Sequence, residues 1–215
     1  FQSEHIPTAL YCDPSVQLAG LPGRTVGRNP LPSIDVVRKA AAGWGIEAGR
    51  PVYIYDGGNG LFAARAWWVL RWAGVQDVHI LDGGFAAWDG EGFPTVAGPG
   101  GIVVPRGVEL TEGNLPSATM EDVRAFEGLL IDARGARRFQ GLREILDLRA
   151  GHIPGARNLP VNDLFDPGSH KVKDTDTIRD RFSQLGATQN TDPAGVITYS
   201  GSGNHSALLL AAMEH

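Results

Sequence analysis

The sequence predicts an α/β protein of two similar domains, each a parallel sheet flanked by helices. The first observation is an internal repeat: residues 5–9 (HIPTA) match residues 152–156 (HIPGA), and residues 55–60 (YDGGNG) match residues 199–204 (YSGSGN). The two matches occur in the same order at nearly equal spacing, which indicates a duplicated domain. The second observation is that strand and helix patterns alternate within each copy, as they do in parallel sheets covered by helices.

In the first copy, a short run of β-branched and aromatic residues at 51–55 predicts a buried strand. Glycine-rich residues follow at 57–60, and a wide apolar stripe at 61–70 then predicts a helix. Residues 75–81 predict the next strand, which ends at the sequence DGG. The first copy therefore has the strand–loop–helix–strand order of a parallel sheet.

In the second copy, a helix is predicted at 120–126, with Thr119 as its N-cap and an aspartate three residues later. Strands are predicted at 129–131 and 195–199, and a second helix at 206–214. The same order of elements therefore surrounds the repeated motif in both copies.

Glycine- and proline-rich residues 98–116 predict a linker, so we expect domains over residues 1–97 and 117–215. The flanks of the repeat are unequal. The second copy has over thirty residues before its HIP segment and the first has four, whereas only the first continues far beyond its glycine-rich helix. We therefore expect the plan to be truncated at both ends, and each absent piece to carry a strand.

The composition is that of a soluble globular protein, with 42% hydrophobic and 20% charged residues. The net charge is −5 and no lysine- or arginine-rich block occurs, so we expect neither nucleic acid nor a membrane as a partner. No apolar run approaches the ~20 residues that span a bilayer. The single cysteine, Cys12, excludes an internal disulfide; we expect a cytoplasmic protein in which Cys12 is a small buried apolar residue.

Residues 200–206 (SGSGNHS) join the predicted strand to the predicted helix, at the sheet edge where parallel sheets carry function. Alternate glycines permit the backbone to curl tightly with its amides pointing inward, and the dipole of the following helix adds positive potential at the same place. The loop therefore predicts a site for an anion or for a thiolate of lowered pKa. A plain turn between a strand and a helix would favour the same residues. No lysine follows the glycines, which excludes a Walker A loop, and the glycines of a nucleophile elbow are absent.

Longer motifs resemble a known family. They are DAR at 132–134, RF at 138–139, Gly141, Glu144, Asp147, AGHIPGA at 150–156, GRNPLP at 27–32 and LDGGFAAW at 81–88. Together they resemble the thiosulfate and 3-mercaptopyruvate sulfurtransferases, which are tandem-domain members of the rhodanese family. The resemblance covers nearly the whole chain, and it implies two rhodanese-like domains. The first is then the inactive copy, with Asp56 at the nucleophile position.

The resemblance implies a sulfurtransferase. In the family, a loop cysteine takes the outer sulfur of a small anionic donor, thiosulfate or 3-mercaptopyruvate, and holds it as a persulfide. The sulfur then passes to a thiol or cyanide-like acceptor. Ser200 stands at the cysteine position. The other loop residues are expected to bind the donor anion: Gly201, Ser202, Gly203, Asn204, His205 and Ser206.

Arg138 matches a family arginine that holds the donor's anionic end, a task that suits a guanidinium fork. The alternative is a salt bridge to Glu144 or Asp147. The family match assigns structural roles to His152 and to the DAR motif. No metal or other cofactor is expected, because the six histidines lack ligand spacing and no cofactor motif occurs.

Ser200 changes the chemistry, because a serine hydroxyl needs a dedicated base to become nucleophilic, whereas the loop alone can lower the pKa of a thiol from its usual ~8.5. We therefore expect the Ser200 form to be inactive. Two explanations stay open: an engineered replacement of cysteine, or a natural non-catalytic relative. Asn29 and Asn204 also depart from the family pattern, which favours divergence, and His205 could serve as an acid or base.

The alternative function is a non-catalytic rhodanese-like module that binds an anion or a partner protein. A phosphatase of related fold matches poorly, since its loop is one residue longer and closes with an arginine, and no arginine follows Ser206.

Overall fold

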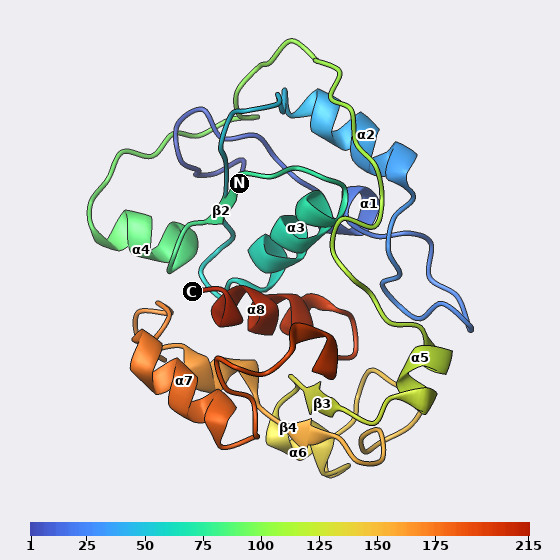
Figure 1. Cartoon of the computed structure of the whole chain (residues 1–215). Coiled ribbons are helices and arrows are strands. Elements are labelled where there is room, and N and C mark those ends of the chain that lie inside the picture. The colour runs from blue at the N-terminus through green and yellow to red at the C-terminus, as the bar shows by residue number, and fades with distance from the viewer. The chain divides into compact units, whose positions relative to one another are not determined.

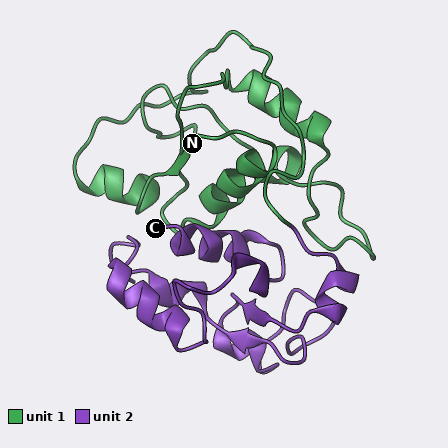
Figure 2. Ribbon diagram, viewed as in Figure 1, with its two compact units in different colours: residues 1–116 green, residues 117–215 purple.

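The computed structural model describes residues 1–215 and divides into two compact units, unit 1 (Phe1–Pro116) and unit 2 (Ser117–His215), coloured separately in Figure 2. Both units contain parallel strands and flanking helices, which confirms the predicted fold class. None of the helices combines the length and the apolar character needed to cross a membrane.

Unit 1 contains a two-stranded parallel sheet and four helices, and these four helices are labelled in Figure 1. The elements are β1 (Val52–Ile54), β2 (Val78–Ile80), α1 (Pro14–Gln17), α2 (Ile34–Gly43), α3 (Leu61–Trp72) and α4 (Gly84–Gly90). Helix α3 is apolar on most of its surface and is buried accordingly, with Val69 0% and Leu70 2% exposed. Strand β2 begins later than predicted, because the amide of Val75 donates to Leu70 O at 2.9 Å and closes the end of α3.

Unit 2 contains a three-stranded parallel sheet in the order β4-β3-β5. Its elements are α5 (Met120–Ala125), β3 (Leu129–Asp132), α6 (Ala136–Phe139), β4 (Arg157–Asn158), η1 (Val161–Leu164), α7 (Thr175–Ser183), η2 (Pro193–Gly195), β5 (Val196–Tyr199) and α8 (Asn204–Met213). The register of β3 and β5 places Asp132 opposite Tyr199 at the carboxyl edge of the sheet. Helix α8 buries Leu208 and Leu209, which are 3% and 0% exposed, and so fixes the loop that precedes it.

The predicted capping box is present at the start of unit 2. The Asp122 amide donates to Thr119 Oγ1 at 3.2 Å, and the Thr119 amide donates to Asp122 Oδ2 at 2.7 Å. Residues 98–116 contain no helix or strand and group with unit 1. Leu110 anchors this segment: it is 2% exposed, and its carbonyl accepts from Arg38 at 2.8 Å.

The repeat is visible in matched contacts. The Tyr55 hydroxyl accepts from the Ile6 amide in unit 1, and the Tyr199 hydroxyl accepts from the Ile153 amide in unit 2, both at 3.1 Å. Each bond ties the segment after the repeated histidine to the residue before the glycine-rich loop. The two copies therefore use the same internal brace.

Candidate active site

The candidate loop leaves the carboxyl end of β5 and enters α8 at Asn204. Gly203 caps the helix in the left-handed region, at φ 83°, where a residue with a Cβ would be strained. The turn aims the first amides of α8 back toward Ser200. The loop residues are half-buried, and Ser206 is buried at 8% exposed.

Ser200 Oγ lies among donors supplied by its own loop. It accepts from the Gly203 amide at 3.0 Å and from the Ser206 amide at 3.4 Å. The Ser206 hydroxyl lies 3.4 Å from Ser200 Oγ and donates to Gly203 O at 3.1 Å. A negatively charged atom at this position would accept hydrogen bonds from the same two amides. The positive end of the α8 dipole would stabilise its charge as well.

No base contacts Ser200, since its hydrogen-bond partners are two amides and the Ser206 hydroxyl. His205 follows in the first turn of α8. Burial lowers the pKa of its imidazole, and the nearby positive charges of Arg138 and Arg134 lower it further, against an opposing effect of Asp132. His205 is therefore neutral near pH 7 and adds no positive charge to the loop.

The corresponding loop of unit 1 is closed by its own carboxylate. Asp56 Oδ1 accepts from the amides of Gly58 at 2.9 Å and Gly60 at 3.0 Å, while Oδ2 accepts from Phe62 at 3.0 Å and Ala63 at 3.3 Å. Asp56 thus occupies the place of an anion. The family resemblance places Asp56 at the nucleophile position of an inactive copy, and these four bonds give it a structural role there.

The two loops differ in length by one residue, which corrects the sequence match beyond the position of Ser200. The left-handed N-cap is Gly60 in unit 1 and Gly203 in unit 2, an offset of 143, whereas the tyrosines before the loops are offset by 144. Gly60 therefore corresponds to Gly203. Helix α8 begins at Asn204, two residues before the predicted helix at 206–214.

A buried ion pair supports the loop from the neighbouring strand. Arg134 Nε and Nη2 donate to the two oxygens of Asp132, Nη2 to Oδ2 at 2.6 Å, and Asp132 is 0% exposed. Arg134 also donates to Gly151 O at 2.7 Å and lies over the Tyr199 ring at 5.9 Å. Burial raises the pKa of Tyr199 to about 12. These contacts agree with the structural role predicted for the DAR motif.

Arg138 forms both of the ion pairs that the sequence offered as its alternative role. Its Nη2 lies 2.8 Å from Glu144 Oε2 and 2.7 Å from Asp147 Oδ2, and its Nε lies 3.1 Å from Glu144 Oε2. Nη1 makes no hydrogen bond. Arg138 is also near enough to His205 to lower that pKa. Donor binding by Arg138 stays a prediction, and it would use Nη1.

His152 and Cys12 have structural rather than chemical roles. His152 Nδ1 lies 2.7 Å from Phe139 O, and its ring stacks on Phe139 with 3.7 Å between ring centroids. Cys12 is half-buried rather than fully buried, and burial raises its pKa to about 12. A thiol with this pKa stays protonated at neutral pH and is a poor nucleophile.

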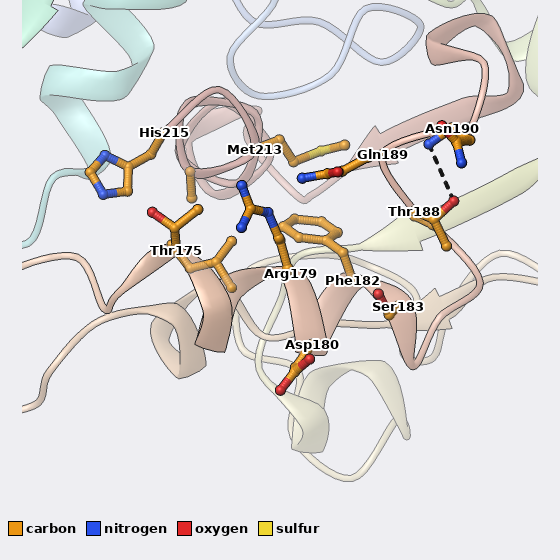
Figure 3. A pocket seen from close by; sticks show the side chains of 13 residues that line it. Thr175, Arg179, Asp180, Phe182, Ser183, Thr188, Gln189, Asn190, Met213 and His215 are labelled. Carbon is orange, nitrogen blue, oxygen red and sulfur yellow. Dashed lines mark hydrogen bonds between the residues drawn. The ribbon is translucent and has the colours of Figure 1, made fainter.

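A cavity of about 630 Å³ lies elsewhere in unit 2, among α7, residues 187–190 and the last turn of α8 (Figure 3). Arg179, Phe182 and Met213 are among the residues that line it, and no residue of the candidate loop does. Because α8 is ten residues long, the cavity lies about 15 Å along the helix from the loop. The cavity therefore takes no part in the chemistry considered for Ser200.

Two contacts that hold the loop in place were not predicted from the sequence. Tyr55 and Tyr199 each precede the glycine-rich loop of their copy, and each hydroxyl accepts from the equivalent isoleucine amide. The repetition of this tyrosine was the only signal of the contact in the sequence. The carboxylate of Glu144 joins Arg138 to Arg134, whose Nη1 lies 3.7 Å from it. The family motif was the only sequence feature that singled out Glu144. Its carboxylate binds the backbone amides of the next three residues, and backbone contacts of this kind require no particular residue types.

Two stretches of the chain, residues 1–91 and 117–215, match the Rhodanese-like domain family. The "Probable 3-mercaptopyruvate sulfurtransferase" of Pseudomonas aeruginosa is 35% identical over 211 residues, covering 94% of this chain and 72% of the relative. A thiosulfate sulfurtransferase of Gallus gallus is 33% identical over 145 residues, 65% of this chain and 50% of that protein. The crystal structure of SseA from Escherichia coli superposes with a TM-score of 0.84 at 30% identity, over 98% of this chain and 78% of SseA.

Proposed function

Because the chain belongs to the rhodanese family, we propose that position 200 is the sulfur-carrying position of a sulfurtransferase that uses 3-mercaptopyruvate or thiosulfate. The relatives' names supply these two donor classes. The observation that carries the proposal is the pair of amides, Gly203 and Ser206, which donate to the side-chain atom of residue 200. A thiolate or persulfide there would be stabilised by the same two donors.

With a cysteine at this position, the transfer balances without an added oxidant. The loop thiolate attacks the outer sulfur of the donor, and the bond between that sulfur and the rest of the donor breaks. The electron pair leaves with sulfite or with the enolate of pyruvate, which then takes up a proton. A thiolate or cyanide acceptor attacks the same sulfur, and the loop thiolate is regenerated.

Serine at position 200 blocks the first step. No base accepts the proton of Ser200, so its hydroxyl is not activated as a nucleophile. His205 is neutral but makes no hydrogen bond to Ser200, so it does not serve as that base. We therefore propose that the chain is inactive as it stands and that the surrounding loop remains suited to a thiolate.

Arg138 would hold the anionic end of the donor through Nη1 while its other nitrogens stay paired with Glu144 and Asp147. This arrangement orients the guanidinium and limits its motion. Because both carboxylates offset the charge of Arg138, the loop amides supply most of the attraction for the donor. Gly201, Ser202 and Asn204 complete the loop in this proposal.

The test is sulfur-release activity of the Ser200→Cys variant with 3-mercaptopyruvate and with thiosulfate. Turnover with either donor is expected, and the preferred donor would assign the substrate. The matched controls are Ser202→Cys, which places a thiol elsewhere in the same loop, and the unaltered chain, which contains Cys12 alone. Equal activity in Ser200→Cys and Ser202→Cys, or none in either, would refute the proposal.

The second candidate is a non-catalytic anion-binding module. The absence of a base at Ser200 favours it, because binding needs only the amides. Thiosulfate would then raise the melting temperature of the unaltered chain, whereas chloride at equal ionic strength would not. Equal melting temperatures in the two salts would exclude this candidate.

A further inference from the structure

Four large apolar side chains are exposed within seven residues of unit 2. Leu142 is 68% exposed, Ile145 75%, Leu146 58% and Leu148 104%. We call this segment, residues 142–148, the apolar ridge. Single exposed apolar residues are ordinary, but a cluster of four on one segment is typical of an interaction surface.

The apolar ridge is held in place by a carboxylate beneath it. The side chain of Glu144 is 5% exposed, and its Oε1 accepts from the amides of Ile145 at 3.0 Å, Leu146 at 2.9 Å and Asp147 at 3.0 Å. Arg138 binds the same carboxylate through two nitrogens. The segment cannot turn its apolar side chains inward without breaking this network, so their exposure is built into the fold.

Positive charge surrounds the apolar ridge. Arg137, Arg143 and Arg149 are exposed and form no ion pair. Residues 134–149 contain five arginines and two carboxylates, although the whole chain has a net charge of −5. This segment is therefore a local basic and apolar surface on an acidic protein.

We propose that the apolar ridge and the three arginines form a docking surface for an acidic protein segment that carries apolar side chains. Leucines of the partner would cover the ridge, and its carboxylates would pair with Arg137, Arg143 and Arg149. Such charge complementarity accelerates association and fixes the register of the two partners.

Two other occupants fit less well. A second copy of this chain, related by two-fold symmetry, would bring the same arginines face to face. A lipid surface would have to accept Asp147, whose side chain is 28% exposed and lies within the ridge. Burying that carboxylate at a bilayer interface is unfavourable.

The surface lies beside the candidate loop. Arg134 contacts Glu144, which anchors the ridge, and also lies over the ring of Tyr199, the residue before Ser200. The anchor of the ridge and the start of the loop therefore share Arg134 as a neighbour. Assigning the docked acidic segment to a sulfur acceptor rests on the proposed function, whereas the docking itself does not.

The test measures binding of a fluorescent peptide of alternating glutamate and leucine to the unaltered chain by fluorescence anisotropy. The same peptide with lysine in place of glutamate is the charge control. We expect the acidic peptide to bind more tightly and to weaken at high salt. Leu148→Asp and Arg143→Glu should each weaken binding by about tenfold.

The matched control is Ile102→Asp, because Ile102 is 99% exposed and lies in unit 1. Leu148 is also fully exposed, so neither substitution disturbs the core. Equal binding of the two peptides, or equal loss in Leu148→Asp and Ile102→Asp, would overturn the proposal. Binding to anionic lipid vesicles that needs Leu148, without binding to the acidic peptide, would overturn it in favour of a membrane.

Discussion

Removal of the Asp56 carboxylate should destabilise unit 1 in a way that added anions repair. The Asp56 carboxylate accepts hydrogen bonds from four backbone amides at 2.9 to 3.3 Å, two in the loop and two in the first turn of α3. Asp56→Ala removes both acceptor oxygens and so all four hydrogen bonds at once. Because α3 contributes much of the core of unit 1, the loss should reach the whole unit.

The expected cost of Asp56→Ala is about 2–3 kcal/mol. Loss of a helix cap costs up to about 2 kcal/mol, and two further loop amides lose a charged acceptor that water only partly replaces. Asp56→Ser should cost about half as much, because Ser200 shows that a hydroxyl at this position retains two amide bonds.

Urea unfolding followed by tryptophan fluorescence isolates this effect, since all five tryptophans lie in unit 1. The control is Asp192→Ala, which removes an N-cap in unit 2 and should leave the fluorescence transition unchanged. Acetate or formate should restore part of the stability of Asp56→Ala by filling the vacated place.

Two results would refute this reasoning. One is an Asp56→Ala variant as stable as the unaltered chain, which would mean that the four bonds add nothing net. The other is a loss of stability that acetate does not reduce beyond the effect of chloride at equal ionic strength. The loop of unit 1 would then not be an anion cradle.

Three further predictions concern unit 2, which lacks tryptophan and is followed by circular dichroism. Asp132→Ala should cost about 3–5 kcal/mol, because it leaves Arg134 buried without its partner, and urea unfolding measures the loss. Backbone amides and Arg138 lower the pKa of Glu144 from 4.5 to about 2, so the stability it adds is complete above pH 4.5 and is lost as the pH falls toward 2. Glu144→Gln should flatten an acid titration of the unfolding midpoint over that range. Tyr199→Phe should cost about 0.5–1.5 kcal/mol in the same urea assay, through loss of its bond to the Ile153 amide.

The sequence predicted the central elements because they carry strong local patterns. The apolar runs around β1, α3, β3 and β5 appear where expected, within a few residues. Helices α2 and α7 were not predicted. Helix α7 buries only Ile178 and Phe182, so its apolar pattern is sparse, and its Asp174 cap was the remaining signal. Two-residue β4 is defined only by its pairing with β3, which no local pattern reveals.

The position of the site in the sequence was predictable, but the length of its loop and the partners of its side chains were not. The glycines and the repeat marked residues 200–206, and the family motifs marked Arg138. The one-residue difference between the loops was hidden, because the sequences align equally well until the helix starts are known. The partners of Arg138 were anticipated only as an alternative, since ion pairs six and nine residues apart depend on how the intervening chain turns.

The central claim is that residue 200 occupies a sulfur-carrying position, and intact mass spectrometry of Ser200→Cys tests it most directly. After mixing with 3-mercaptopyruvate or thiosulfate and removal of the donor, the variant should gain the mass of one sulfur atom. A reducing thiol should then remove it. The unaltered chain, which retains Cys12, should gain none. A Ser200→Cys variant that gains no sulfur from either donor would contradict the claim.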